Sequence, residues 1–298
     1  MPLIPAGQLR FFSINIFKAI GVAADKAQTV ANLLVEANLA GHDSHGVLRL
    51  PQYVRMIQDK AIQPDAEIEI VSQTPSSAVI DGHWGFGQVI ASQAMEIAIA
   101  KARTHVVSAV NVYNCNHIGR LADYVLMAAQ ARMIGLLFVN GHGADQGTAP
   151  WGGIARRLGT NPTACAIPTG RDDPMLIDIT TSVVAGGKLR AYRNRSEALP
   201  AGWLIDSAGN PSADPAVYFD APKGALLPFG GLAGHKGYGL GLLVDILAGA
   251  MCEAGCSRPS APRLGNGLLA MVINIESFIP IADFEGHVAQ LIDFVKAS

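Results

Sequence analysis

The sequence has few charged residues: they make up 15% of its 298 residues, against 50% hydrophobic residues. The formal net charge is −2, and the only local excess of basic residues lies at positions 188–195. A basic surface for nucleic acid is therefore not indicated, and we expect no nucleic-acid partner. A composition this apolar is typical of a sheet buried on both faces or of a subunit interface.

Cysteine is also scarce. The four cysteines form no Cys-x-x-Cys pair, which argues against a disulfide framework and favours a reducing compartment. No segment near the N-terminus resembles a signal peptide. The most apolar helix candidate, residues 238–254, contains Asp245 and is short for a membrane span. The sequence therefore predicts a cytoplasmic protein with no membrane partner.

The common nucleotide and metal motifs are missing as well. No Gly-x-Gly-x-x-Gly, Walker loop or His-Glu-x-x-His segment is present, so neither a Rossmann site nor a zincin-type metal site is indicated. Potential metal ligands exist, but no pair of histidines has zincin spacing. They are His42, His45, His117, His142 and His235, together with Asp43 and Asp178. We expect no metal site and keep a metal-dependent hydrolase or lyase as an alternative.

Hydrophobic periodicity predicts alternating helices and strands, and hence a layered α/β fold. Helices are expected at residues 8–40 with a break at Gly21, and at 50–59, 88–104, 118–131, 234–254 and 284–297. Strands are expected at residues 67–71, 77–81, 106–112, 134–140, 163–168, 176–179 and 267–275. Residues 141–159 are predicted to be loop, and residues 186–228 a surface excursion with little periodicity.

Residues 41–51, Gly-His-Asp-Ser-His-Gly-Val-Leu-Arg-Leu-Pro, combine a proton donor with a ligand for carboxylates. If they are helical, His45 and Arg49 share one face at about 5–6 Å. His45 can exchange a proton near neutral pH, and Arg49 can hold a carboxylate with two parallel hydrogen bonds. The pair suits reduction of a 2-oxo acid. An ordinary helix end capped by Asp43 or Ser44 is the other interpretation.

Four further segments occupy strand ends, turns or helix starts, where α/β proteins place ligand groups: residues 114–120, 159–162, 178–182 and 234–239. His117 is a second candidate acid or part of a helix cap. Asn161, in a Gly-Thr-Asn-Pro turn, could meet a ribose or a carboxamide. Asp178 could orient a histidine or cap a helix. Lys236 lies in a glycine-rich helix start, where a pyrophosphate could bind or helices could pack closely.

Taken together, these segments resemble the malate/L-lactate dehydrogenase family of NAD(P)-dependent oxidoreductases, which do not use a Rossmann fold. The resemblance spans residues 8–275, and the matching motifs stand in the family's order. They are Asp43-Ser44-His45-Gly46 with Arg49, Asn116-His117-Ile118-Gly119-Arg120, Pro150-Trp151-Gly152-Gly153, Gly159-Thr160-Asn161-Pro162, Asp178-Ile179-Thr180-Thr181-Ser182 with Lys188, and Gly234-His235-Lys236-Gly237-Tyr238-Gly239.

The resemblance implies a fold and an assembly. It implies a non-Rossmann, three-layer α/β cofactor-binding domain with a mixed sheet over residues 76–239. A helical substrate and dimerisation domain would be built from both chain ends, residues 1–75 and 240–298. A homodimer is expected.

The resemblance also implies roles for individual residues. His45, His117 and Asp178 are expected to be catalytic, and Ser44, Arg49 and Thr160 to bind the substrate. The cofactor is expected to contact His117, Gly119, Arg120, Asn161, Asp178, Thr180, Ser182, Lys188, His235 and Lys236. Three departures leave the substrate open. The chain looks shorter than typical members between Gly249 and Gly267, it ends without their Pro-Gly-Glu segment, and Gly141 beside His142 replaces a common serine.

The sequence thus predicts reversible hydride transfer between NAD(P)H and the 2-position of a small 2-oxo or 2-hydroxy acid of malate or lactate type, or of a cyclic 2-imino acid. Basic residues just after the expected cofactor strand favour NADPH over NADH, because a guanidinium matches phosphate oxygens. These residues are Lys188, Arg190, Arg193 and Arg195. Which of His45 and His117 donates the proton stays open, and a non-catalytic paralogue is a second alternative.

Overall fold

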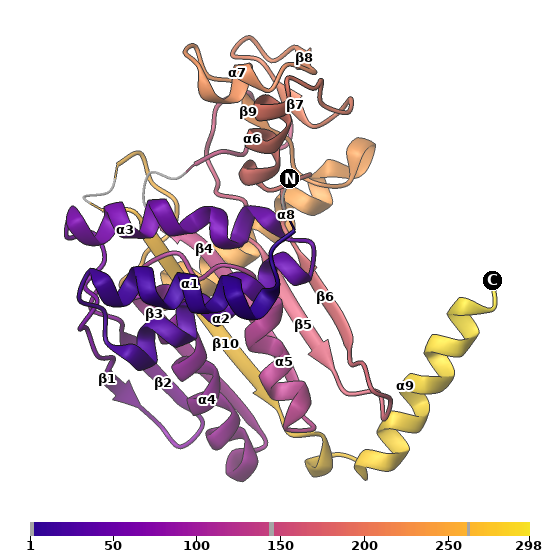
Figure 1. Cartoon of the computed structure of the whole chain (residues 1–298). Coiled ribbons are helices and arrows are strands. Elements are labelled where there is room, and N and C mark those ends of the chain that lie inside the picture. Colours follow the sequence, from indigo (N-terminus) through magenta and orange to yellow (C-terminus); the bar gives the residue numbers. More distant parts are fainter. Residues whose placement is uncertain (1–2, 143–145, 261–262) are drawn as a thin grey trace.

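The computed structural model describes residues 3–142, 146–260 and 263–298, without the side chain of His142. A seven-stranded mixed sheet with the strand order β1-β2-β3-β10-β4-β5-β6 forms its centre (Figure 1). The strands are β1 (Glu69–Gln73), β2 (Ser77–Asp81), β3 (Val107–Cys115), β4 (Ile134–His142), β5 (Thr163–Ile167), β6 (Met175–Ile179) and β10 (Gly265–Ile273). β2 and β3 pair in parallel, and the other neighbours pair antiparallel.

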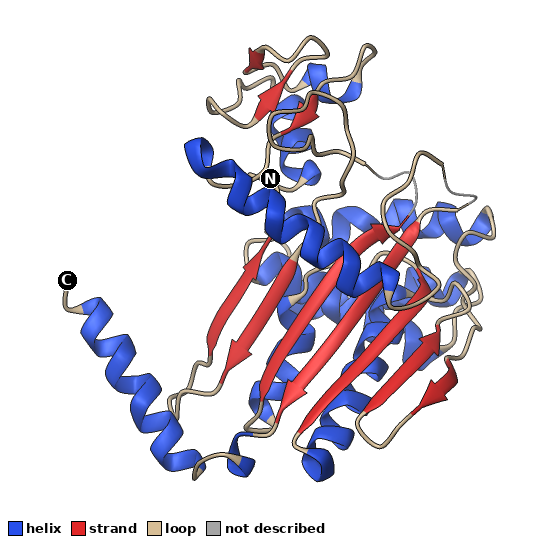
Figure 2. Cartoon of the chain, turned by 180° about the vertical axis from the view of Figure 1, so that it is seen from behind, coloured by secondary structure: helices blue, strands red, loops and turns tan. Residues whose placement is uncertain are grey.

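Helices cover the two faces of this sheet unequally. α4 (Gly87–His105) and α5 (Ala122–Gln130) lie on one face. α8 (Gly234–Asp245), which continues into a π-helical turn at Ile246–Ala250, crosses the other face (Figure 2). Strands β5 and β6 have no helix in front of them on that side. The sheet is therefore covered more completely on the face of α4 and α5.

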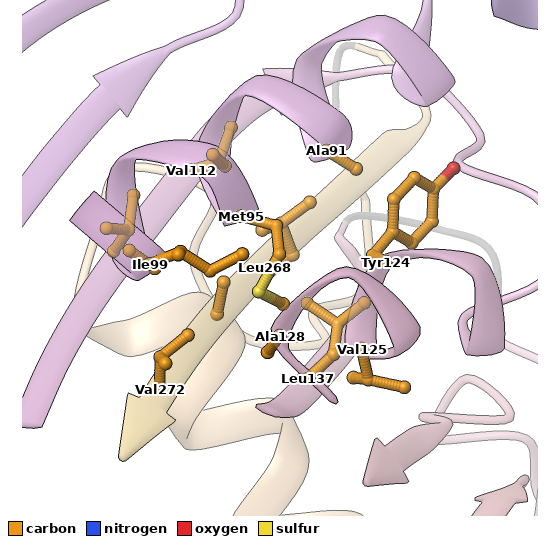
Figure 3. Close-up of a cluster of buried hydrophobic side chains, with 14 of the residues drawn as sticks. Ala91, Met95, Ile99, Val112, Tyr124, Val125, Ala128, Leu137, Leu268 and Val272 are labelled. Atoms are coloured by element: carbon orange, nitrogen blue, oxygen red, sulfur yellow. The ribbon is translucent and has the colours of Figure 1, made fainter. Parts of the chain in front are cut away.

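The main core lies between the sheet and the helices α4 and α5 (Figure 3). α4 buries alanines at Ala91, Ala94, Ala98 and Ala102, and such small residues let a helix approach the sheet closely. Larger side chains fill the remaining space, among them Met95, Val125, Leu137 and Leu268. The buried residues of α4, which recur with the 3.6-residue helical period, thus pack against strand residues that are buried at every second position.

A second core joins the N-terminal helices α1 (Ala6–Ala19), α2 (Ala24–Leu39) and α3 (Leu50–Gln58). Phe17 meets the edge of Phe86 with ring centroids 5.7 Å apart. The break expected at Gly21 is confirmed, because this residue has a φ of +89° between α1 and α2. These helices lie over the same side of the sheet as α4 and α5.

The prediction of a surface excursion at residues 186–228 was wrong. The segment folds into a small unit with its own core around Leu189, Leu199, Leu204 and Leu226. It contains α6 (Gly186–Arg195), β7 (Leu204–Ile205), β8 (Pro211–Ser212), α7 (Ala216–Phe219) and β9 (Ala225–Leu226). The sequence hides this unit because its strands are two residues long and α6 buries only Leu189.

The expected division into domains also needs a change. β10 pairs with both β3 and β4, so residues 265–273 form part of the central sheet and not of a helical domain. β1, within residues 1–75, lies at the edge of the same sheet. The C-terminal helix α9 (Ile281–Lys296) projects from the body, as Figure 1 shows. Within the described parts of the chain, no helix is long and apolar enough to span a membrane.

Candidate active site

The segment that carries His45 and Arg49 is not one regular helix, and this expectation was wrong. It forms two short 3₁₀ turns, Asp43–His45 and Val47–Arg49, on either side of Gly46. The side chain of Asn38 shapes the segment: its Oδ1 accepts the Val47 N–H at 2.9 Å, and its Nδ2 donates to Asp43 Oδ1 at 2.6 Å. A Cβ on Gly46 would lie 2.2 Å from Asn38 Oδ1. Glycine is therefore needed for Asn38 to approach this backbone.

The guanidinium of Arg49 is held in a fixed plane. Its Nε donates to the carbonyl oxygen of Ser44 at 2.7 Å, and its Nη1 donates to Gln52 Oε1 at 2.7 Å. The start of α6 lies directly against this pair, because a Cβ on Gly187 would be 2.8 Å from Ser44 Cβ and 3.7 Å from Arg49 Nη2. The small unit thus packs against the segment expected to bind the substrate.

The structure brings the two candidate histidines together. The rings of His45 and His117 stack, with centroids 5.5 Å apart and an interplanar angle of 18°. Ser44 Oγ lies 3.0 Å from His45 Nδ1, and Tyr53 Oη lies 2.7 Å from His117 Nδ1. Residues from the N-terminal helical region and from the loop after β3 therefore form one site.

Burial keeps both rings neutral near pH 7. Desolvation, with smaller effects of the charges on Arg49 and His42, lowers the pKa of His45 to about 4. Desolvation, followed by Arg49 and His45, holds the pKa of His117 well below its usual range. In this state each ring has one nitrogen that can accept a hydrogen bond and one that carries a proton.

Asn116 fixes the backbone next to His117. Its amide Nδ2 donates to the carbonyl oxygens of Ala61, Trp84 and Gly85 at 3.1, 2.6 and 3.0 Å. The first residue of α4 packs on the same peptide, since a Cβ on Gly87 would lie 2.2 Å from the carbonyl oxygen of Asn116 and 2.4 Å from that of His117. The position of His117 therefore depends on the start of α4.

The segments expected to bind the cofactor also meet. The carbonyl oxygen of Thr160 accepts the Thr181 N–H at 3.0 Å, and Asn161 Nδ2 donates to the carbonyl oxygen of Gly241 in α8 at 3.0 Å. Two buried polar atoms in these loop segments, Asn161 Oδ1 and Thr148 Oγ1, have no hydrogen-bond partner among the described residues. Buried polar groups in proteins are normally paired, so these two atoms fit a polar ligand such as a nicotinamide carboxamide.

Comparison with known proteins shows the family of this chain. The sequence profile described as malate/L-lactate dehydrogenase matches residues 4–298. The chain belongs to this family. A malate dehydrogenase of Pyrococcus horikoshii is 41% identical over 303 aligned positions, covering 99% of this chain and 82% of the relative.

Solved structures of family members have the same fold. The sulfolactate dehydrogenase of Methanocaldococcus jannaschii superposes with a TM-score of 0.86 at 34% identity, covering 100% of this chain and 85% of the other. A Δ1-piperideine-2-carboxylate reductase of Pseudomonas syringae has a TM-score of 0.88 at 26% identity, covering 100% and 89%. The predicted family and α/β fold class are confirmed, and the relatives support a 2-hydroxy acid oxidoreductase.

Asp178 does not orient a histidine through a hydrogen bond within the described residues, which was one of the two roles expected for it in this member of the malate/L-lactate dehydrogenase family. Its Oδ2 accepts the N–H of Ala122, the first residue of α5, at 2.9 Å. Burial raises its pKa, and the Ala122 N–H opposes that shift. Among the described residues, it makes no hydrogen bond to His117. Arg120 pairs with Asp123, with Nε 3.2 Å from Oδ2.

The other residues expected to contact the cofactor differ in burial. Ser182 is buried and donates to the Val184 carbonyl oxygen at 2.8 Å, and Thr180 donates to that of Ser182 at 2.8 Å, so both hydroxyls can still accept hydrogen bonds. His235 and Lys236 are exposed at the start of α8, and Lys188 is exposed in α6. Gly119 is buried with a φ of +81°.

In the described parts of the chain, no three His, Cys, Asp or Glu side chains gather into a candidate metal site. The side chain of His142, one of the histidines considered as a ligand, lies outside the described atoms. Sequence reasoning missed Asn38, Tyr53 and Gln88, and it named Asn116 only as part of a motif, without a role. All four residues hold the site through hydrogen bonds. Their residue types carry no catalytic signature, and only the fold reveals them.

Proposed function

We propose that the protein transfers a hydride reversibly between NAD(P)H and the 2-position of a small 2-oxo or 2-hydroxy acid, or of a cyclic 2-imino acid. One observation carries the proposal: Arg49 and the stacked pair of His45 and His117 form a single site. A guanidinium for the carboxylate beside an imidazole for the 2-oxygen or 2-nitrogen is the chemistry that such a substrate requires. Relatives named for malate, sulfolactate and piperideine-2-carboxylate support this class.

The residues of the chain would bind, orient and move a proton. Arg49 would hold the carboxylate, with Ser44 and Thr160 as further substrate contacts. A neutral histidine can take the hydroxyl proton when the acid is oxidised and return it on reduction. The bound nicotinamide supplies the hydride chemistry, and Asn161 and Thr148 would hold its polar edge. Asp178 would act by holding the start of α5 beside the cofactor segments.

A preference for NADPH is part of the proposal. Arg193 and Arg195 are already paired with carboxylates, with Arg193 Nη2 3.1 Å from Asp220 and Arg195 Nε 2.8 Å from Glu197. Lys188 and Arg190 are the better candidates for a 2′-phosphate. Arg190→Ala should lower kcat/KM for NADPH and leave that for NADH unchanged. Arg195→Ala is the matched control, and equal kcat/KM for the two cofactors in the unaltered protein would remove the idea.

The decisive test of the function is NADH and NADPH absorbance with a panel of 2-oxo acids and cyclic imines. Turnover of any member supports the proposal. A folded protein that binds cofactor but turns over none of them would instead be the non-catalytic paralogue. Activity that is lost with a chelator and restored by metal would favour the metal-dependent hydrolase or lyase.

We further propose a cytoplasmic homodimer. The four cysteines are free thiols, which supports a reducing compartment. On the face crossed by α8, Leu243 and Ile246 are 47% and 51% exposed, and Ile177 of β6 is 45% exposed. Ile177 lies on this face because the neighbouring residue Asp178 reaches α5 on the opposite one. An apolar surface of this kind favours a second copy as its partner.

A further inference from the structure

The motif around His117 leaves one feature unexplained, a buried chain of side chains behind its ring. Gln88 Nε2 lies 2.8 Å from Tyr53 Oη, and Tyr53 Oη lies 2.7 Å from His117 Nδ1. Gln88 and Tyr53 are both 1% exposed. The three residues come from α4, α3 and the loop after β3. Because each hydrogen bond has one donor and one acceptor, the donor at one end of this chain determines which nitrogen of the His117 ring carries the proton.

We propose that Gln88 and Tyr53 fix His117 as the Nε2–H tautomer, so that His117 donates a hydrogen bond to the substrate's 2-oxygen while His45 exchanges the proton. The catalytic roles given to His117 and His45 rest on the proposed function. The tautomer of His117 is a property of the unliganded protein and does not depend on that function. Gln88 and Tyr53 are positioning residues, since both act through His117.

The direction follows from the number of protons available. A tyrosine hydroxyl has a single proton, and burial raises the pKa of Tyr53 to about 12, so that proton stays in place. Gln88 and His117 are the two hydrogen-bond partners of the Tyr53 hydroxyl among the described residues. Because the Gln88 amide donates to the Tyr53 oxygen, His117 Nδ1 is the acceptor left for the Tyr53 proton, which would otherwise be buried without a partner. The neutral imidazole of His117 must then carry its own proton on Nε2.

The amide of Gln88 has a preferred rotation. As it stands, Gln88 Oε1 is buried and has no hydrogen-bond partner in the part of the chain that the structure describes. The opposite rotation would turn the carbonyl oxygen to Tyr53 and leave an NH₂ group, with two donors, in the same unpaired place. Orphaned buried N–H groups are rarer than under-satisfied carbonyls, so the observed rotation is favoured.

The locked ring cannot accept a proton from substrate. Its Nδ1 lone pair is used by Tyr53 and its Nε2 already carries hydrogen, so His117 can only donate a hydrogen bond to a developing oxyanion. His45 is not locked in this way, because Ser44 Oγ, 3.0 Å from its Nδ1, can donate or accept. On oxidation of a 2-hydroxy acid, the O–H bond breaks and its proton forms a bond to His45 as hydride leaves the 2-carbon for NAD(P)⁺.

The groups that face His117 agree with a neutral ring. His45 stacks on it from the first 3₁₀ turn, Arg49 acts from the second, and Tyr53 contacts it from α3. The positive charge on Arg49 and the burial of the site both oppose an imidazolium. Among the described residues, no carboxylate contributes to the shift in the pKa of His117.

The test is ¹⁵N NMR of the unliganded protein labelled at histidine, with the His117 signals assigned from their loss in His117→Gln. We expect an unprotonated Nδ1 and a protonated Nε2 between pH 6 and 8. Gln88→Met keeps the volume but frees Tyr53 to accept, so the ratio of Nε2–H to Nδ1–H should fall about five-fold, the value of one ordinary hydrogen bond. Ser92→Ala, which removes only a bond to the Gln88 backbone, should leave the ratio unchanged.

Two outcomes would overturn the lock: a protonated Nδ1 in the unaltered protein, or a ratio that does not respond to Gln88→Met. Tyr53→Phe provides a second variant if Gln88→Met does not fold.

The catalytic roles of His117 and His45 are tested separately by kinetics. His117→Gln keeps an N–H donor and should retain the pH dependence of kcat/KM for oxidation, whereas His45→Gln should abolish it. The reverse result would assign the proton to His117, and absence of any turnover in the unaltered protein would refute the function without touching the NMR result.

Discussion

Arg49 is the residue for which the chemistry of a single side chain can be tested most directly. Two of its nitrogens are held by Ser44 and Gln52, so the plane that it presents is set before substrate arrives. Arg49→Lys keeps the positive charge but loses the planar guanidinium that can hold a carboxylate with two parallel hydrogen bonds. We expect KM for the acid to rise roughly 10- to 100-fold, the value of one charge-assisted hydrogen bond. Dissociation constants for NADH and NADPH, measured by fluorescence, should not change, and an equal loss of cofactor affinity would contradict this role.

The pKa of His45 should respond to substrate. Burial, then the charge of Arg49, lowers it to about 4 in the free protein. A carboxylate bound to Arg49 offsets that charge, so the pKa of His45 should be higher in the complex. For oxidation, activity falls as pH drops through this pKa, and the acidic limb of kcat should lie at higher pH than that of kcat/KM. Coincident limbs in the two pH profiles would show that Arg49 does not couple to His45.

Residue chemistry alone identified only part of this site. His45, Arg49 and His117 could be predicted because imidazole and guanidinium groups suit a 2-oxo acid. Tyr53 and Gln88 could not, since they are 64 residues and 35 residues from their partners His117 and Tyr53. Their function is a matter of which hydrogen bond they complete, and that is decided by helix packing.

At the scale of elements, the start of α4 controls the position of His117. Gly87→Ala would place a methyl group against the Asn116 and His117 peptide. We expect a loss of about 1–3 kcal/mol in the free energy of unfolding, measured with denaturant, together with reduced turnover. Gly286→Ala in α9 is the control, because its added Cβ meets nothing within 4 Å. That variant should gain about 0.5–1 kcal/mol. Equal effects of the two changes would show that the close contact at Gly87 does not matter.

The elements themselves were largely predictable. Long amphipathic helices and buried strands have periodic patterns that the sequence displays, and β2 was found at its predicted residues 77–81. The segment 186–228 was not predictable, because two-residue strands are too short to alternate. Strand order was also hidden, since the pairing of β10 between β3 and β4 depends on contacts between distant parts of the chain.

At the scale of the whole molecule, the exposed apolar face can be tested through Ile246→Lys. A buried cation at a subunit interface is costly, so the proposed homodimer should dissociate at micromolar concentration in sedimentation velocity. Val71 is 52% exposed and lies in β1, at the edge of the sheet opposite to β6. Val71→Lys should therefore leave the dimer intact. An unaltered protein that sediments as an active monomer at this concentration would refute the assembly.

The central place of β10 has a consequence for biosynthesis. Its residues, Gly265–Ile273, are translated long after β3 and β4, yet the strand separates β3 from β4 in the finished sheet. A ribosome-bound chain therefore holds two unpaired strand edges that face a gap, and open edges invite pairing with other chains. Nascent protein should depend on chaperones until β10 has been translated, and truncation before residue 265 should yield aggregates in place of a smaller folded product.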